Sequence, residues 1–232
     1  MSELLRCDHL TKVYGNTVAL RDVSFTLQSG RIVGLLGPNG SGKTTLINIL
    51  NGLLTPTSGE VRIDGEKPGP STKAKVAYLP DSIYLNSWMT VKQIVAYFAD
   101  FYADFSSERA FEMLERLGIS PSQRLKALSK GNKEKVCLIL VMSRQARLYV
   151  LDEPIAGVDP AARDYVISTI INNYNPEATV LISTHLIADI EQVLDEVLFI
   201  QQGTLILQKS VDQIREENGK CVDELFREVF RW

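Results

Sequence analysis

The stretch GPNGSGKTT, Gly37 to Thr45, decides the fold of this 232-residue chain. It matches the pattern G-x-x-x-x-G-K-S/T, follows the apolar run IVGLL and precedes the helical pattern TLINILNGL, which is the context that the motif requires. Its glycines let successive backbone N–H groups curve around an anion, and the following helix adds the positive end of its dipole. A chance glycine-rich turn is the alternative. We interpret the stretch as a phosphate-binding loop, which predicts that the chain binds a nucleotide.

The parts of this loop have different expected roles. Lys43 is predicted to reach the β- and γ-phosphates and to assist catalysis there, and Thr44 is predicted to ligate magnesium. The predicted nucleotide-binding residues of the loop are Gly37, Pro38, Asn39, Gly40, Ser41, Gly42, Lys43, Thr44 and Thr45.

A second strand supplies acidic side chains. In LYVLDEP, Leu148 to Pro154, apolar and aromatic residues carry Asp152 to the end of a buried strand, where a carboxylate can hold magnesium directly or through water. Glu153 follows in a position to orient and deprotonate an attacking water. An acidic pair after a strand is more often a solvated turn. Beside a phosphate-binding loop, however, the pair indicates nucleotide hydrolysis.

The composition of the chain excludes several classes of protein. A hydrophobic share of 45%, a charged share of 23% and a net charge of −3 are ordinary for a globular domain and give no general footprint for nucleic acid. The longest apolar run, Val136 to Met142, is far shorter than the roughly 20 residues that span a bilayer. The N-terminus does not resemble a signal peptide. Cys7, Cys137 and Cys221 lie far apart, which predicts reduced thiols in a cytoplasmic protein.

Apolar runs and helical patterns alternate along most of the chain. VSFTL (Val23 to Leu27) alternates apolar with other residues, as a half-buried antiparallel strand does, and GEVRIDG has turns at both ends. The runs IVGLL, VAYL, LYVL, TVLIST and EVLFI are largely apolar, which is typical of strands buried on both faces. We therefore predict an α/β fold of the P-loop NTPase class, with a mostly parallel core sheet and an antiparallel β layer near the N-terminus.

The middle of the chain breaks this alternation. From Asp81 to Gln145 there is no good strand pattern, Thr90 with Gln93 resembles a capping box, and IVAYFADFY and RAFEMLERLG have helical spacing. We expect an inserted all-helical subdomain there, and a C-terminal amphipathic helix, VDELFREVF, that packs on its own domain or binds a partner. The predicted division of this single domain, 1–232, is a core subdomain at 1–80 and 146–209, a helical subdomain at 81–145 and a C-terminal helical segment at 210–232.

Four further motifs accompany the phosphate loop and the acidic strand. They are Tyr14 in VYGNTVAL, the segment LSKGN (Leu128 to Asn132), the segment GVDP (Gly157 to Pro160), and STH, which ends at His185. In order and spacing, the six motifs together resemble the ATP-binding subunits of ABC transporters, and the resemblance covers nearly the whole chain. It makes the predicted fold that of an ABC ATPase.

The resemblance implies a role for each motif. Tyr14 would stack on adenine, and His185 would hydrogen-bond the γ-phosphate and hold the attacking water. Asp159 would act across a dimer interface. In this family two domains pack head to tail, and the LSKGN signature meets the γ-phosphate of an ATP held mainly by the other chain. The signature residues are Ser129, Lys130, Gly131 and Asn132.

Each of these residues also has a plainer interpretation. A lone tyrosine such as Tyr14 is more often packed than stacked on a ligand, and His185 can be a core histidine. Asp159 before Pro160 is a good helix start, and Ser129 is a good N-cap. For Asp159 and Ser129 both roles can hold at once.

The chain departs from the family pattern at three positions. Lys130 replaces the first glycine of the signature and adds a positive charge, and Asn132, with its shorter amide, replaces the glutamine. In YLPDS, Asp81 stands where the family has a glutamine that senses magnesium and contacts the membrane subunit. A carboxylate can approach magnesium, so Asp81 is a candidate metal ligand. Its alternative role is that of a turn- or helix-forming residue.

The resemblance implies an ATP-hydrolysing motor subunit. Two such chains, identical or related, would close around two ATP–Mg²⁺ units and drive a separate polytopic membrane subunit from the cytoplasmic side of the membrane. Apolar anchors for that subunit are predicted in the stretch from Ser82 to Thr90, namely Tyr84, Leu85 and Trp88, unless these side chains pack within the helical subdomain. The short C-terminus and the SKG-type signature resemble those of simple exporters, so we expect export.

Three rival functions are less consistent with the sequence. A soluble ABC-type ATPase that acts on ribosomes or DNA usually has tandem domains or a long coiled-coil insertion, and no nucleic-acid partner is expected here. A nucleotide-dependent regulatory module without hydrolysis would not need both Glu153 and His185. A P-loop kinase would not explain LSKGN together with STH.

Overall fold

The computed structural model describes residues 2–230, and its N-terminal part is an antiparallel sheet of three strands. Its strands are β1 (Glu3–Tyr14), β2 (Thr17–Gln28) and β4 (Ser58–Ile63), in the order β2-β1-β4. Alternate residues of β2 are buried from Val23 onward, which confirms the prediction of a half-buried strand. Residue 1 and residues 231–232 lie outside the described residues. Residues 231–232 are the last two of the predicted C-terminal segment.

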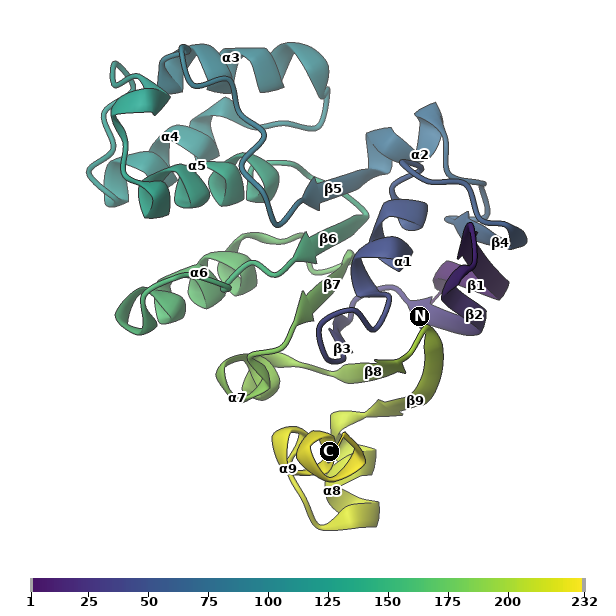
Figure 1. The fold of residues 1–232 in the computed structure, drawn as a ribbon. Coiled ribbons are helices and arrows are strands. Elements are labelled where there is room, and N and C mark those ends of the chain that lie inside the picture. Colours follow the sequence, from purple (N-terminus) through teal and green to yellow (C-terminus); the bar gives the residue numbers. More distant parts are fainter. Residues whose placement is uncertain (1, 231–232) are drawn as a thin grey trace.

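The second sheet forms the centre of the molecule (Figure 1). It has the strand order β5-β6-β7-β3-β8-β9, and all its pairs are parallel except β8 with β9. The strands are β3 (Ile32–Leu36), β5 (Val76–Leu79), β6 (Leu148–Asp152), β7 (Thr179–Thr184), β8 (Glu196–Gln201) and β9 (Thr204–Ser210). Every residue of β3, β6 and β7 is buried, as expected for strands covered on both faces. The predicted fold class is confirmed.

Helices connect these strands. The crossovers use α1 (Lys43–Leu50), the short α2 (Pro70–Lys75), α6 (Pro160–Asn173) and α7 (Ile187–Ile190) with the 3₁₀ turn η2 (Glu191–Val193). Helix α2 was not predicted from the sequence. Proline stands at its N-terminus, and the Thr72 side chain and the Gly69 backbone hydrogen-bond each other.

Three helices lie between β5 and β6 and form a layer at one end of the core sheet (Figure 1). They are α3 (Val91–Phe101), α4 (Ser107–Arg116) and α5 (Lys130–Met142), with the 3₁₀ turn η1 (Leu125–Ala127) before α5. The predicted capping box at α3 is present, because Thr90 Oγ1 accepts from Gln93 N and the Gln93 side chain accepts from Thr90 N.

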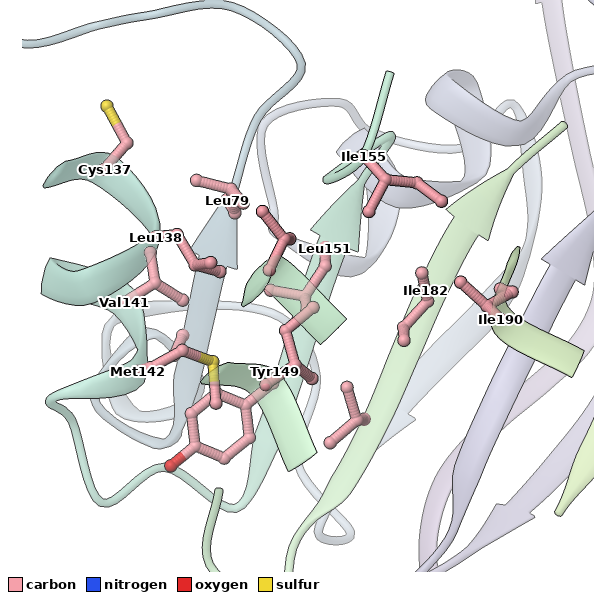
Figure 2. Close-up of a cluster of buried hydrophobic side chains, with 14 of the residues drawn as sticks. Leu79, Cys137, Leu138, Val141, Met142, Tyr149, Leu151, Ile155, Ile182 and Ile190 are labelled. Carbon is pink, nitrogen blue, oxygen red and sulfur yellow. The ribbon is translucent and has the colours of Figure 1, made fainter. Parts of the chain in front are cut away.

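A continuous apolar core joins this helical layer to the sheet. Figure 2 shows Leu138, Val141 and Met142 of α5 facing side chains of β5 and β6, among them Tyr149. Tyr149 is fully buried, and its hydroxyl donates a hydrogen bond to the carbonyl of Arg144, 2.6 Å away. The hydroxyl therefore has a hydrogen-bond partner although the residue is buried.

Arg144 is a buried polar link between the helical layer and the core sheet. Its Nη1 donates to the Val76 carbonyl at 2.5 Å, and its Nη2 donates to the Ala74 carbonyl at 2.6 Å. Its Nε pairs with Asp104 at 3.0 Å, and its guanidinium lies over the Tyr102 ring, 3.9 Å from the ring centroid. A guanidinium suits this position because its planar fork serves several acceptors while one face stacks on an aromatic ring.

The C-terminal helices pack on the same domain. They are α8 (Val211–Asn218), which Ser210 caps, and α9 (Val222–Val229). The rings of Phe226 and Phe230 lie 5.5 and 5.8 Å from the ring of Phe199 in β8. Of the two predicted roles for this segment, packing on its own domain is therefore the observed one. No helix within residues 2–230 is long and apolar enough to cross a bilayer.

We predict that Arg144→Ala lowers the free energy of unfolding by about 3 kcal/mol, because it leaves the buried Val76 carbonyl, the part-buried Ala74 carbonyl and the Asp104 carboxylate without their donor. Urea denaturation monitored by circular dichroism measures the loss. The matched control is Arg116→Ala at the exposed end of α4, which should change the value by less than about 0.5 kcal/mol. A loss at Arg144 no larger than that of the control would contradict the assigned role.

Candidate functional site

The phosphate loop connects β3 to α1, and its glycines allow close packing. A Cβ atom at Gly42, where φ is +109°, would lie 2.7 Å from the carbonyl oxygen of Ala19 in β2. A Cβ atom at Gly37 would lie 2.3 Å from the carbonyl oxygen of Ile200 in β8. Gly40 also has a positive φ, +77°, with open space beside it. Neighbouring strands therefore hold the loop from both sides, while Asn39, Gly40 and Thr44 stay exposed.

Lys43 is buried beneath the loop. Its Nζ donates to the carbonyls of Gly37 and Pro38 at 2.8 and 3.2 Å and lies 3.9 Å from Glu153 Oε1. Burial lowers the pKa of Lys43, while the nearby carboxylates of Glu153 and Asp152 act in the opposite direction. An ammonium group held in this way is positioned for the phosphate groups of a bound nucleotide.

Ser41 offers a further polar atom in the same loop. Its carbonyl accepts from Gly203 N at 2.9 Å, which ties the loop to the turn between β8 and β9. Its buried hydroxyl, in contrast, has no hydrogen-bond partner within the part of the chain that the structure describes. A buried hydroxyl without a partner is unfavourable. An anion bound in the loop would supply the missing hydrogen-bond acceptor.

Asp152 ends β6 and is held by the neighbouring strand β7. Ser183 Oγ donates to Asp152 Oδ1 at 2.5 Å and accepts from Glu153 N at 3.1 Å. Burial raises the pKa of Asp152, and the charge of Asp81 adds to this effect. The hydrogen bond from Ser183, the Thr44 hydroxyl and the Lys43 charge lower it. Ser183 thus keeps the carboxylate fixed at the carboxyl edge of the sheet.

The set of oxygen atoms beside Asp152 suits magnesium. The Thr44 hydroxyl is close enough to lower the pKa of Asp152, so a hydroxyl and a carboxylate oxygen lie together at the mouth of the phosphate loop. No group of three or more His, Cys, Asp or Glu residues within 2–230 could hold a metal ion by itself. Mg²⁺ does not require one, because it usually binds one or two carboxylates together with substrate phosphates and waters. The residues present therefore fit this ion.

Glu153 and His185 form a pair at the ends of β6 and β7. His185 Nδ1 lies 3.0 Å from Glu153 Oε2, and Glu153 has a left-handed backbone with φ of +51°. Left-handed backbone is unusual for a residue with a side chain, and it tends to occur where a functional group must be aimed. The Glu153 side chain is only 14% exposed, whereas that of His185 is 45% exposed. The pair thus lies between the buried Lys43 and solvent.

The LSKGN segment lies at the start of α5. Ser129 caps the helix, since its Oγ accepts from Asn132 N at 3.3 Å, so its plainer predicted role is present. The Lys130 side chain is 79% exposed and lies 3.7 Å from Glu134. Gly131 has open space around it. These residues are reachable by another molecule.

A cavity of about 330 Å³ separates α5 from the acidic strand. Ser129, Gly131 and Asn132 line one side, and Asp152, Glu153 and Asp159 are among the residues that line the other. No residue of 37–45 is among the described residues that line it. The signature of a chain therefore does not share this cavity with the phosphate loop of the same chain.

The remaining predicted residues lie around these groups. Tyr14 ends β1, is 44% exposed, and has the Lys12 ammonium 5.1 Å from its ring centroid. Asp81 is exposed in the loop after β5 and is near enough to raise the pKa of both Asp152 and Tyr78. The pKa of Tyr78 rises to about 12, mainly through burial. Asp159 directly precedes α6, as its helix-start interpretation predicted.

Two residues of this region were missed in the sequence analysis. Ser183 belongs to the STH motif quoted above. Its position near the end of a buried strand was the only feature of the sequence that indicated a polar contact there. Arg163 in α6 gave no signal. In the structure it contacts both the segment before α6 and the helix after His185.

Comparison with known proteins identifies a family. The model of the ABC transporter family matches residues 20–156. The SkfA peptide export ATP-binding protein SkfE of Bacillus subtilis (strain 168) is 32% identical over 236 aligned positions, which cover 99% of this chain and 98% of that protein.

Solved structures agree with this match. The structure described as an ATP-binding subunit of an ABC transporter is 30% identical, with a TM-score of 0.88, and the alignment covers 98% of this chain and all of that one. A dimeric ATP-binding cassette in a post-hydrolysis state, bound to ADP and Pi, shares the fold with a TM-score of 0.78 at 21% identity, over 89% of this chain and 98% of that one.

We predict that Asp152→Asn raises the unfolding temperature of the nucleotide-free protein by about 3 °C at pH 8. Burial raises the pKa of Asp152 in the folded state, so the carboxyl group stabilises the fold while protonated and loses that contribution as the pH rises through the folded-state pKa. Asparagine stays neutral and keeps an acceptor for Ser183. The gain should therefore shrink as the pH falls toward the unfolded-state value of 3.8.

Thermal unfolding in EDTA at pH 8 and pH 5 measures this effect. Asp100→Asn, on the exposed face of α3, is the control and should leave the unfolding temperature unchanged at both values. If Asp152→Asn were destabilising at pH 8, burial would not be the dominant effect on the carboxylate.

Proposed function

Because the chain belongs to the ABC transporter family as an ATP-binding and ATP-hydrolysing subunit, we propose that it is the motor of a transporter whose membrane-spanning subunit is a separate chain. The observation that carries the proposal is the convergence of Lys43, Glu153 and His185 beside the phosphate loop, with separations of 3.9 and 3.0 Å. An ammonium, a carboxylate and an imidazole at these distances suit the hydrolysis of a phosphoanhydride.

Nucleotide binding is assigned to residues 37–45. The backbone N–H groups of the loop and the N-terminus of α1 surround the phosphates, and the Lys43 ammonium exchanges part of its bonding from loop carbonyls to phosphate oxygens. The exposed ring of Tyr14 is assigned to adenine. The turn that follows it leads into β2, the strand that packs against Gly42.

Magnesium is assigned to Thr44 and Asp152, with Asp81 as a further carboxylate nearby. When bound, the ion neutralises charge on the phosphate oxygens. Asp152 is held for this role by the Ser183 hydroxyl, so the carboxylate cannot turn away from the loop. Asp81 is not held in this way, because it is exposed in a loop.

Proton transfer is assigned to Glu153. Its carboxylate accepts a proton from the attacking water, and the His185 ring beside it orients that water toward the γ-phosphate. Glu153 has a left-handed backbone, and its carboxylate lies 3.9 Å from the Lys43 ammonium. The reaction yields ADP and inorganic phosphate.

The signature is assigned to the ATP of a partner chain. Ser129, Lys130, Gly131 and Asn132 stand at the N-terminus of α5, where N–H groups and the helix dipole favour an anion. Among the described residues, none of 37–45 lines the cavity beside these residues, although Asp152 and Glu153 of the same chain do. A structural relative is a dimer with ADP and Pi, so we propose a head-to-tail dimer of this chain with itself or with a related chain.

The membrane subunit is assigned to a second cavity of about 450 Å³ between the end of α1 and the helical layer. Leu53, Tyr84, Phe98 and Tyr102 are among its lining residues, and Leu53 and Tyr84 are exposed. Trp88 is exposed in the same segment as Tyr84, whereas Leu85 packs against the core. Of the three expected anchors, we therefore retain Tyr84 and Trp88. An apolar groove with exposed aromatics fits a helix end of a membrane protein.

Export is the proposed direction of transport. The supporting observations are the SKG-type signature and a relative named for peptide export, which this chain matches over almost its full length. We propose that the subunit lies at the cytoplasmic face of a membrane, attached through its membrane partner. Within residues 2–230, no structural feature favours the alternative of an ATPase acting on ribosomes or DNA.

We predict that Glu153→Gln lowers the rate constant of ATP hydrolysis at least about 100-fold, because the amide cannot accept the proton of the attacking water. The variant should still bind ATP and should accumulate as an ATP-bound dimer. A phosphate-release assay and size-exclusion chromatography in ATP measure the two effects. The control is Glu177→Gln in an exposed loop. Wild-type turnover by Glu153→Gln would remove Glu153 as the base.

We predict that Tyr84→Ala combined with Trp88→Ala weakens binding to the membrane subunit about 30-fold or more, because exposed aromatics are typical anchors of an interface. The measurement is titration of the tagged chain against the detergent-solubilised subunit that co-purifies with the wild type. Val229→Ala, a change at an exposed apolar residue of α9, is the control. Equal affinity of the double variant and the control would place the docking site elsewhere.

A further inference from the structure

Arg163, in the first turn of α6, bridges two segments that flank the catalytic pair. Its Nη1 donates to Asp189 Oδ2 at 2.8 Å, and its Nε donates to the Val158 carbonyl at 3.3 Å. Val158 lies in the GVDP segment before α6, and Asp189 lies in α7, four residues after His185. One side chain therefore fixes both segments relative to each other.

These contacts close a ring around the site. From Glu153 the chain runs through the GVDP segment to Val158, which Arg163 joins to Asp189. From Asp189 the chain runs back to His185, whose ring contacts Glu153 at 3.0 Å. A displacement of the GVDP segment thus has two routes to the catalytic pair, one through the backbone and one through the guanidinium.

The contacts of Arg163 are suited to positioning the catalytic pair and contribute little to the stability of the fold. The Arg163 and Asp189 side chains are 23% and 34% exposed, and pairs with that access to solvent add little to the free energy of unfolding. Arginine nevertheless fits the position, because separate nitrogens of its rigid fork reach the two acceptors at the same time. Lysine has a single nitrogen, which cannot replace both donors with the same geometry.

We propose that Arg163 is a positioning residue that couples the GVDP segment to the His185–Glu153 pair. When a partner chain packs against this segment, the guanidinium carries the displacement to α7 and sets the distance between His185 and Glu153. Each site then becomes competent when the dimer interface around it has formed. This inference rests on the proposed catalytic roles of Glu153 and His185 and adds the contact by which dimerisation reaches them.

The test is steady-state ATP hydrolysis by the full-length chain over a range of protein concentrations, with ATP affinity measured separately by titration of a fluorescent ATP analogue. The variants are Arg163→Ala, Asp189→Asn, the combination of these two, Arg163→Lys, and the exchange of charges in Arg163→Asp with Asp189→Arg. The control is Arg215→Ala, which breaks an exposed ion pair with Asp212 in α8, outside the catalytic region.

We expect Arg163→Ala and Asp189→Asn each to lower kcat about tenfold and to change the affinity for ATP less than about twofold, because neither residue touches the phosphate loop. Their combination should be no slower than either alone, since both remove one contact. Arg163→Lys should keep the ion pair with Asp189. Its rate of ATP turnover should nevertheless increase much less with protein concentration than that of the wild type. The charge exchange should regain at least a third of wild-type kcat.

Several outcomes would overturn the inference. The first is a wild-type kcat in Arg163→Ala, and the second is a wild-type kcat in Asp189→Asn while that of Arg163→Ala is reduced. The third is a charge-exchange variant whose kcat stays below a third of the wild-type value. The fourth is a loss of ATP affinity that is as large as the loss of kcat. An unfolding temperature lowered by more than about 4 °C would show that the effect is structural. If wild-type turnover did not depend on Glu153, the proposed function itself would fail, and the same assay with Glu153→Gln distinguishes that case.

Discussion

The arrangement of the candidate functional site depends on two opposite charges buried at one edge of the core sheet. Lys43 and Asp152 are both buried, and neither could remain there without compensation, because burying an ion costs several kcal/mol. Loop carbonyls stabilise the ammonium, and the Ser183 hydroxyl stabilises the carboxylate. Glu153 stands between them at intermediate exposure. The result is a site that is stable without a ligand and gains further stabilisation when an anion and a cation bind.

This arrangement requires a parallel sheet. β3, β6 and β7 are neighbours that run in one direction, so the phosphate loop, the acidic pair and His185 all emerge at the same edge. The glycines of the loop then permit β2 and β8 to approach, which ties the antiparallel layer and the C-terminal strands to the site. Packing around the loop explains why the site and the core form one unit.

The helical layer is attached to that unit by different means. α5 contributes apolar side chains to the core, as Figure 2 shows, and Arg144 adds a cluster of polar contacts to the end of α2 and the start of β5. Between these attachments lie two cavities, one beside the signature and one beside Tyr84. The helical layer thus borders both the signature and the proposed membrane contact.

The sequence alone determined the local parts of this protein, and the tertiary structure decided how they contact one another. The phosphate loop, the strand that ends in Asp152, the cap at Thr90 and the membership of the family all follow from short motifs, because glycine content, apolar periodicity and capping act within a few residues. The contacts of Ser183 with Asp152 and of Arg163 with Asp189 join residues 31 and 26 positions apart. No local pattern specifies such pairs. They arise because the strand order places β6 beside β7 and sets α6 beside α7, and strand order is the result of packing over the whole chain.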